Sequence, residues 1–205
     1  MDKGEKMEPL GGDLTRGKKE GNVPYGTIVS LSESPLRLGL ICAGTDDGNI
    51  QLTKDGGYTW TLVSNNLPKG LYVSRVIASG FREGRVYATL NGYRNDNFTP
   101  WIYVSEDYGK TWNSLGSNLP SGPLNVIRED PEYEDILYLG SDNGLYASFS
   151  RGKTFMSLGN SLPAVPVHDI VIQKTAKEIV IGTHGRSIYI ASLDDIYIIY
   201  KKFIK

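Results

Sequence analysis

Two octapeptides, TKDGGYTW at 53–60 and SEDYGKTW at 105–112, hold an aspartate between a hydroxyl residue and a glycine. Such a carboxylate can act as a catalytic acid or nucleophile, or it can cap a turn by accepting backbone hydrogen bonds. A third copy, SFSRGKTF, carries Ser150 where the first two carry Asp55 and Asp107. A hydroxyl group can replace a carboxylate that caps a turn but not one that catalyses, so the motif is predicted to be structural.

The other residues of these three boxes fit a structural role as well. Each glycine is expected to adopt the positive φ that a tight turn requires, and each aromatic ring is expected to be buried between neighbouring units. The predicted structural residues are Asp55, Gly57, Trp60, Asp107, Gly109, Trp112, Gly152 and Phe155.

The boxes mark an internal repeat. They begin 52 and 43 residues apart, and each box aromatic is followed eight residues later by a proline, at Pro68, Pro120 and Pro163. Around each box, short apolar runs separated by Gly, Asp and Asn turns indicate four short strands. Units of four strands with a period in the forties are typical of β-propeller blades. The chain is therefore predicted to be all-β, with four-stranded antiparallel blades at about 25–68, 72–120, 123–163 and 165–194.

The fourth unit has three predicted strands and no box. The N-terminal segment MEPLGGDLT aligns without gaps on WNSLGSNLP of the second unit, which predicts an orphan fourth strand at 6–12. Either this strand completes the last blade and closes a four-bladed ring, or it belongs to a preceding blade of a larger propeller. The propeller is expected to span 1–196, with a C-terminal tail at 197–205.

A binding site is expected at the channel of the propeller, on the face opposite the boxes. The first strand of each blade lines the channel, and alignment of the units places Thr27, Arg75, Asn125 and His168 at equivalent rim positions. The turns between second and third strands add Asp46, Asp47, Arg94, Asp96, Asp142, Asn143, His184 and Arg186. Polar groups that converge in a concavity form a binding-site hypothesis. The ligand-binding candidates are Arg75, Asn125, His168, Asp169, Arg94, His184 and Arg186.

No catalytic constellation emerges from these residues. A glycosidase needs two carboxyl groups roughly 5–10 Å apart across the scissile bond, and no pair stands out among the rim aspartates. The Phe/Tyr-Arg-Ile-Pro motif of sialidases is not matched by GFREG at 80–84. His168, Asp169 and His184 lack a recognised metal-ligand spacing. No catalytic residue, metal or cofactor is predicted.

Charge and composition limit the classes of partner that the chain is expected to bind. With 22 basic and 23 acidic residues, the net charge of −1 gives no electrostatic reason to expect nucleic acid. The longest apolar run, IYIIYKKFI at 196–204, is too short to span a bilayer, so membrane insertion is not predicted. The single cysteine, Cys42, excludes an internal disulfide, and no signal peptide is recognised at the N-terminus.

The boxes and the tracts YVSRVIAS, VIREDP, PVHDIVI and GTHGRSIYI carry a family resemblance. From about Met7 to Ile196, the chain resembles the C-terminal propeller part of bacterial sortilin-like proteins with neuraminidase (BNR, or Asp-box) repeats, which are often labelled glycosyl-hydrolase-like. The resemblance implies a many-bladed, usually exported propeller, and thus an extracytoplasmic location if the chain derives from an exported protein. Sortilin binds peptides, and related Asp-box propellers include sialidases, xyloglucanases and a photosystem II assembly factor.

Two functions follow. The leading hypothesis is a non-enzymatic binding or scaffold propeller that recognises a peptide, a protein or a glycan on the rim formed by the first strands. The alternative is a glycoside-hydrolase module of the sialidase or xyloglucanase type, or a fragment of one.

Overall fold

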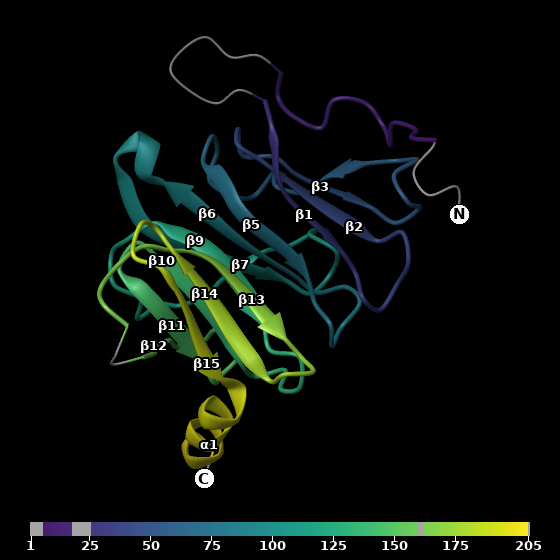
Figure 1. Cartoon of the computed structure of the whole chain (residues 1–205). Coiled ribbons are helices and arrows are strands. Elements are labelled where there is room, and N and C mark those ends of the chain that lie inside the picture. The colour runs from purple at the N-terminus through teal and green to yellow at the C-terminus, as the bar shows by residue number, and fades with distance from the viewer. Residues whose placement is uncertain (1–5, 18–25, 160–161, 205) are drawn as a thin grey trace.

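The computed structural model describes residues 6–17, 26–159 and 162–204, and these residues form an all-β architecture with one C-terminal helix (Figure 1). Three antiparallel sheets have four strands in the orders β1-β2-β3-β4, β5-β6-β7-β8 and β9-β10-β11-β12, and a fourth has the order β13-β14-β15. The predicted all-β fold with four-stranded blades is confirmed for the first three units. We number these sheets as blades 1 to 4.

The strand bounds show how short the outer strands are. The elements are β1 Ile28–Glu33, β2 Ile41–Thr45, β3 Ile50–Thr53, β4 Thr61–Leu62, β5 Tyr72–Ala78, β6 Val86–Gly92, η1 Tyr93–Asn95, β7 Asn97–Ser105, β8 Asn113–Ser114, β9 Leu124–Glu129, β10 Leu137–Ser141, β11 Gly144–Ser148, β12 Met156–Ser157, β13 Val167–Gln173, β14 Glu178–Thr183, β15 Ile188–Ser192 and α1 Leu193–Phe203. The longer segment at 91–100 extends the β6–β7 hairpin around the 3₁₀ turn η1.

Apolar side chains pack between consecutive blades. One buried cluster joins blades 1 and 2, a second joins blades 2 and 3, and a third joins blades 3 and 4 and includes residues of α1. Glycine allows close approaches between blades: a Cβ atom at Gly44 of blade 1 would lie 2.5 Å from Val73 Cγ1 of blade 2, and one at Gly140 of blade 3 would lie 2.7 Å from Val167 Cγ1 of blade 4. The blades follow one another in chain order, with β1, β5, β9 and β13 on the inner side.

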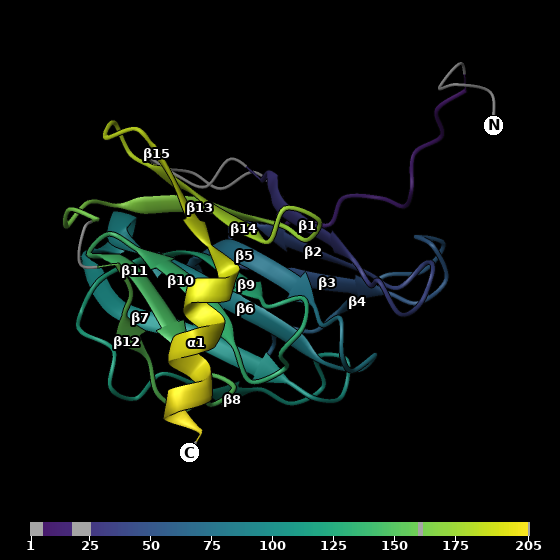
Figure 2. The same cartoon turned by 60° about the horizontal axis from the view of Figure 1, so that its bottom comes forward.

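The C-terminal end differs from the expected tail. Residues 193–203 form α1, which continues directly from β15 (Figure 2). Asp194 N donates to the Ser192 hydroxyl at the N-terminus of the helix, and Lys201 and Lys202 lie in its last turn, a pattern that favours a helix. The Tyr197 hydroxyl donates to Asp130 at 3.1 Å, so the helix is anchored to the turn between β9 and β10.

The predicted strand at 6–12 is not formed within one copy of the chain. Residues 6–17 contain no strand, and β15 is the outer strand of blade 4. The segment lies instead on blade 1, where Asn49 and Gln51 donate to Leu14 O, each at 3.2 Å, and Arg16 N donates to Asp47. The N-terminal segment therefore does not close a four-bladed ring within the described part of the chain.

The boxes form the turns between third and fourth strands. In the second box, Asp107 Oδ1 accepts from Thr111 N at 2.9 Å, and Oδ2 accepts from the Thr111 hydroxyl at 2.7 Å. The Ser105 hydroxyl accepts from Gly109 N at 2.7 Å, and Gly109 has a φ of +80°. Asp55 makes the corresponding bonds in the first box, and Ser150 accepts from Thr154 N at 3.2 Å in the third. The carboxylates are thus held by the turns that they cap.

These bonds change the acidity of both box aspartates. Hydrogen bonds from the Thr59 hydroxyl and amide lower the pKa of Asp55 to about 2. Bonds from the Thr111 amide and hydroxyl lower the pKa of Asp107 to about 2. An aspartate in an unfolded chain has a pKa of about 3.9. Because the folded value is lower, the ionised boxes contribute their full stability above about pH 4 and lose it as the pH falls toward about 2.

The third box provides a matched test of this contribution. Ser150→Asp restores the carboxylate, so we expect a higher urea midpoint at neutral pH and no gain at about pH 2, where the carboxyl is protonated. Asp107→Asn should show the reverse, a loss at neutral pH that shrinks toward about pH 2. Urea denaturation across this pH range measures both variants. Parallel shifts at every pH would show that the carboxylate charge does not contribute.

Candidate functional site

A cavity of about 570 Å³ opens between the innermost strands. We call it the rim cavity, and it is lined by Val29, Tyr72, Ser74, Arg75, Asn91, Tyr93, Arg94, Asn125, Asp142, Pro166, His168 and His184. These residues come from the first strands of all four blades or the segments leading into them, from the end of β6, and from the turns between the second and third strands. No box residue lines it.

The rim cavity brings together five of the seven predicted ligand-binding residues, namely Arg75, Asn125, His168, Arg94 and His184. Asp169 does not line the cavity but pairs with Arg75. Arg186 is exposed in the turn between β14 and β15 and does not line the cavity. Asp142 lines it, whereas Asp46, Asp47, Asp96 and Asn143 do not.

A β-bulge recurs near the start of each first strand. The pairing register shifts between Ile28 and Ser30 in β1, and the same shift occurs in β5, β9 and β13. The residues within these shifts, which are structurally equivalent, are Val29, Ser74, Asn125 and His168. The predicted equivalence of Thr27 and Arg75 with Asn125 and His168 is therefore wrong. Each bulge inserts an extra residue, and sequence alignment does not reveal where it lies.

The amide of Asn125 is already used within the protein. Its Oδ1 accepts from Asn91 Nδ2 at 2.9 Å, and its Nδ2 donates to Asp142 Oδ1 at 2.9 Å. A further contact joins Nδ2 to Val167 O at 3.3 Å. Asn125 therefore holds Asp142 in the cavity wall, and the exposed ring of His168 lies beside that of His184, with centroids 5.1 Å apart.

Two arginines of the first strands share one carboxylate. Arg75 Nη2 and Arg128 Nη2 lie 2.9 and 3.1 Å from the same oxygen, Asp169 Oδ1. Arg128 Nε also donates to Ile170 O at 2.7 Å, while Arg75 Nε is buried without a hydrogen-bond partner. Burial and the nearby charge of Arg75 lower the pKa of Arg128. Two cations facing one anion leave a site that favours further negative charge.

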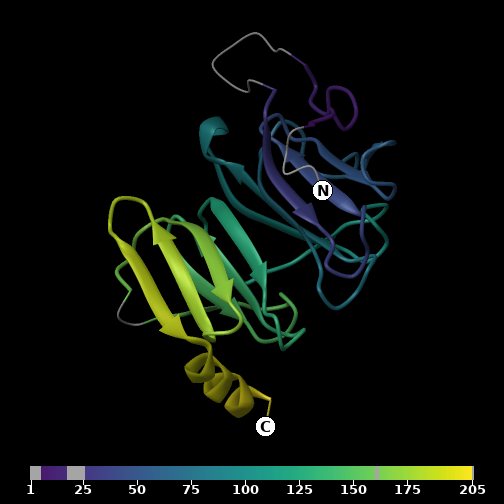
Figure 3. The same cartoon turned by 45° about the vertical axis from the view of Figure 1, so that its right-hand side comes forward.

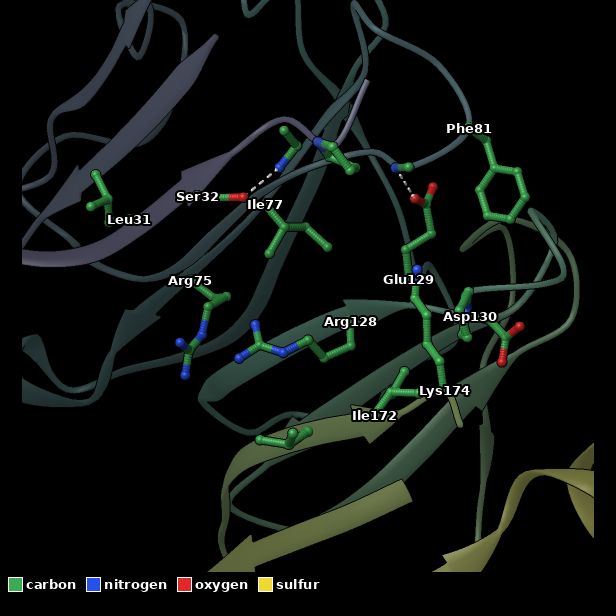
Figure 4. Close-up of a pocket in the computed structure, with 15 residues that line it drawn as sticks. Leu31, Ser32, Arg75, Ile77, Phe81, Arg128, Glu129, Asp130, Ile172 and Lys174 are labelled. Atoms are coloured by element: carbon green, nitrogen blue, oxygen red, sulfur yellow. Dashed lines mark hydrogen bonds between the residues drawn. The ribbon is translucent and has the colours of Figure 1, made fainter. Parts of the chain in front are cut away.

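A second cavity, of about 520 Å³, is lined by both arginines of this pair (Figure 4). Arg75 lines both cavities, and Arg128, Glu129 and Lys174 line only the second. Glu129 accepts from the Ser79 hydroxyl at 2.7 Å and from Gly80 N at 2.7 Å, and burial raises its pKa. We call this the inner cavity.

Sequence reasoning missed Arg128, which faces the channel. Alternation counted from Asn125 points to Ile127 and not to Arg128, because the bulge at Asn125 shifts the alternation of side chains by one residue. Counting from the bulges, Arg75 corresponds to Asp169, and Arg128 corresponds to Ile77 and Val171. Ile77, Arg128 and Val171 all line the inner cavity.

The arrangement offers little support for acid–base catalysis by paired carboxylates. Among the residues that the structure describes, Asp142 is the one carboxylate that lines the rim cavity. In the inner cavity, Glu129 is hydrogen-bonded to blade 2, and Asp130 accepts from Tyr138 and Tyr197. In the described residues, no group of three His, Cys, Asp or Glu side chains is placed to hold a metal ion. No described helix is long and apolar enough to cross a membrane.

Comparison with known proteins shows the fold. No family model and no curated protein matches the sequence. Among solved structures, a GH74 enzyme of Niastella koreensis matches with a TM-score of 0.64 and 15% identity, covering 81% of this chain and 28% of that one. A GH74 xyloglucanase of Xanthomonas campestris matches with a TM-score of 0.66 and 10% identity, covering 82% and 29%. YCF48 bound to D1 peptide matches with a TM-score of 0.59 and 17% identity, covering 81% and 52%.

These neighbours are β-propeller proteins, and the chain has the β-propeller fold that they share. It spans less than a third of the length of the two GH74 enzymes and about half that of YCF48. At these identities, the likeness concerns the fold and not the activity.

The shared carboxylate of Asp169 can be tested with an added anion. Asp169→Asn leaves Arg75 and Arg128 without their counter-charge, so sulfate should raise the melting temperature of this variant more than that of the parent chain. Differential scanning fluorimetry over a sulfate series at constant ionic strength measures this difference. Asp194→Asn, which breaks the exposed pair with Lys177, serves as the control and should respond as the parent does. Equal sulfate responses in all three proteins would argue against an anion site.

Proposed function

We propose that this propeller is a non-enzymatic binding module whose rim cavity recognises a peptide, a protein or a glycan that carries a carboxylate. The observation that supports this function is the convergence of Arg75, Arg94, Asn125, His168 and His184 in one cavity. They come from three blades, so the cavity depends on the folded arrangement of the blades and not on one local motif.

The charges favour an acidic ligand. Arg75 contributes a guanidinium group to the cavity wall, and Arg94 lies exposed at the cavity edge, 5.7 Å from the Tyr72 ring. Guanidinium groups bind carboxylates with two parallel hydrogen bonds, which gives direction as well as attraction. Tyr72 and Tyr93 add aromatic surface, which suits either a peptide side chain or a sugar ring.

The comparisons agree with this proposal without identifying a ligand. YCF48 was solved with a bound D1 peptide, so a propeller of similar fold binds a peptide. The proposed family, bacterial sortilin-like proteins with Asp-box repeats, points the same way, and an exported location is proposed on the same basis. Glycoside hydrolysis, suggested by the GH74 neighbours, has less support because the rim cavity holds one carboxylate where the usual mechanism needs two.

Binding measurements with matched ligands test the proposal. We expect the chain to bind members of an acidic panel, made of peptides with a free C-terminal carboxylate and uronic-acid oligosaccharides. The same peptides with an amidated C-terminus and neutral oligosaccharides should bind more weakly. Arg75→Ala should weaken the affinity roughly tenfold or more, as expected for the loss of a charged hydrogen bond. Isothermal titration calorimetry gives the dissociation constants.

Arg186→Ala is the matched control, because this arginine is exposed near the same rim but outside the cavity. It should leave the affinity unchanged. If a bound ligand is held equally well by Arg75→Ala and by a variant that also lacks Arg94 and His168, the site lies elsewhere. Cleavage of an oligosaccharide that is abolished by Asp142→Asn would favour the hydrolase alternative.

A further inference from the structure

The last blade exposes a face that is buried in every preceding blade. In the pairing of second with third strands, Ile50, Ile102 and Leu145 lie opposite corresponding residues of β2, β6 and β10. Ile188 of β15 lies opposite the corresponding residue of β14, so the four positions are equivalent. Those three side chains are at most 4% exposed, because the next blade covers them, whereas Ile188 is 67% exposed. Ile190 and Val171 are exposed on the same blade. We call Val171, Ile188 and Ile190 the outgoing face.

The first blade exposes the opposite face, which the later blades bury against the blade before them. Leu31 of β1 is equivalent to Val76, Ile127 and Ile170, counting from the bulge in each first strand. These three residues are fully buried against the preceding blade, but Leu31 is 68% exposed. Ile28 is likewise exposed, although its equivalents Val73, Leu124 and Val167 are buried. We call Ile28 and Leu31 the incoming face. Thus each end of the row lacks the partner that the repeat provides elsewhere.

Within the described part of the chain, blade 4 has three strands and no outer fourth strand (Figure 3). In blades 1 to 3, the residue after the fourth strand donates its N–H to the third strand: Val63 to Ile50 O, Leu115 to Ile102 O and Leu158 to Leu145 O, at 2.9–3.0 Å. The equivalent acceptor in blade 4 is Ile188 O, to which the residue after a fourth strand would donate its N–H. An open strand edge of this kind is a template for pairing with another strand.

The N-terminal segment packs against blade 1, at the position where the fourth strand of a preceding blade would end. Trp60 Nε1 of the first box donates to Leu10 O at 3.3 Å, as Trp112 Nε1 of the second box donates to Val63 O at 2.8 Å. A Cβ atom at Gly57 would lie 2.9 Å from Leu10 Cβ, and one at Gly109 would lie 2.7 Å from Val63 Cβ. Leu10 therefore occupies the position of the residue that follows the fourth strand of a preceding blade.

The residues before Leu10 are suited to be that strand. Glu8 and Pro9 correspond to Asn113 and Ser114 of β8, yet residues 6–10 are exposed and contain no strand. Hydrogen-bonded and non-hydrogen-bonded pairs alternate in an antiparallel ladder, and Leu115 forms a hydrogen-bonded pair. The position of Pro9 is then non-hydrogen-bonded, so its missing N–H removes no ladder bond. Glu8 would donate to Ile190 O.

We propose that a second copy of this chain docks head to tail. The outgoing face of one copy packs on the incoming face of the other, and residues 6–10 of the latter supply the fourth strand beside β15 of the former. The contact repeats the packing and the pairing seen between blades 1 to 4. Two such contacts, related by a twofold axis, satisfy both ends of both chains in a ring.

Sedimentation velocity of the 205-residue chain tests this contact. The parent should form dimers that dissociate on dilution. Ile188→Asp on the outgoing face and Leu31→Asp on the incoming face should each give monomers that melt at the temperature of the diluted, dissociated parent, because both side chains are exposed within one copy. Ile198→Asp is the control, since Ile198 is an exposed isoleucine of α1 that belongs to neither face, and it should still dimerise.

Mixing the two face variants tests the head-to-tail geometry. Ile188→Asp retains an intact incoming face and Leu31→Asp an intact outgoing face, so the mixture should form dimers that neither variant forms alone. Glu8→Pro should weaken dimerisation roughly fivefold per contact, the equivalent of one lost hydrogen bond, while Pro9→Ala should not. A monomeric parent, or dimers that persist in both face variants, would overturn the proposal.

Discussion

Apolar packing between consecutive blades is the interaction on which the rest of this structure depends. A four-stranded blade has two faces, and the strands of blades 2 and 3 are buried on both. The sheets hold their positions because Val73 and Val76 insert against blade 1 while Tyr87 and Ile102 receive blade 3. Hydrogen bonds join the strands within a blade, but burial of these side chains is what joins one blade to the next. The side chains at the channel are therefore positioned by the packing of their neighbours in the strand, since Val73 and Val76 flank Ser74 and Arg75.

The rim and the boxes show two different uses of repetition. The box glycines and hydroxyl residues repeat because each turn needs the same backbone geometry, and Ser150 can stand in for an aspartate. The bulge in each first strand is also repeated, but the residue within it changes from Val29 to Ser74, Asn125 and His168. The backbone is nearly symmetric, whereas the chemistry that it presents is not. An asymmetric ligand requires this combination.

The repeat explains how far the sequence could predict the structure. Box spacing and strand alternation predicted the blades, because both follow from local turn chemistry and from the period of a strand. The bulges, which moved the equivalence of Arg75 by one residue, depend on pairing with the second strand and have no signature in one strand alone. Arg128 was missed for the same reason. The capping pattern of α1 was present at Ser192, but the aromatic run that follows it matches a strand as readily as a helix.

The N-terminal segment shows why a correct alignment can lead to a wrong topology. Its similarity to the end of a blade is real, since Leu10 occupies the same position as Val63, but position along the repeat does not specify which copy of the blade it joins. The rim cavity is built chiefly from blades 2 to 4 and needs no second copy. The inner cavity differs, because Leu31 and Val171 line it and also belong to the two end faces. Head-to-tail docking would therefore reshape the inner cavity while leaving most of the rim cavity unchanged, so the proposed ligand binding and the proposed self-association can be tested separately.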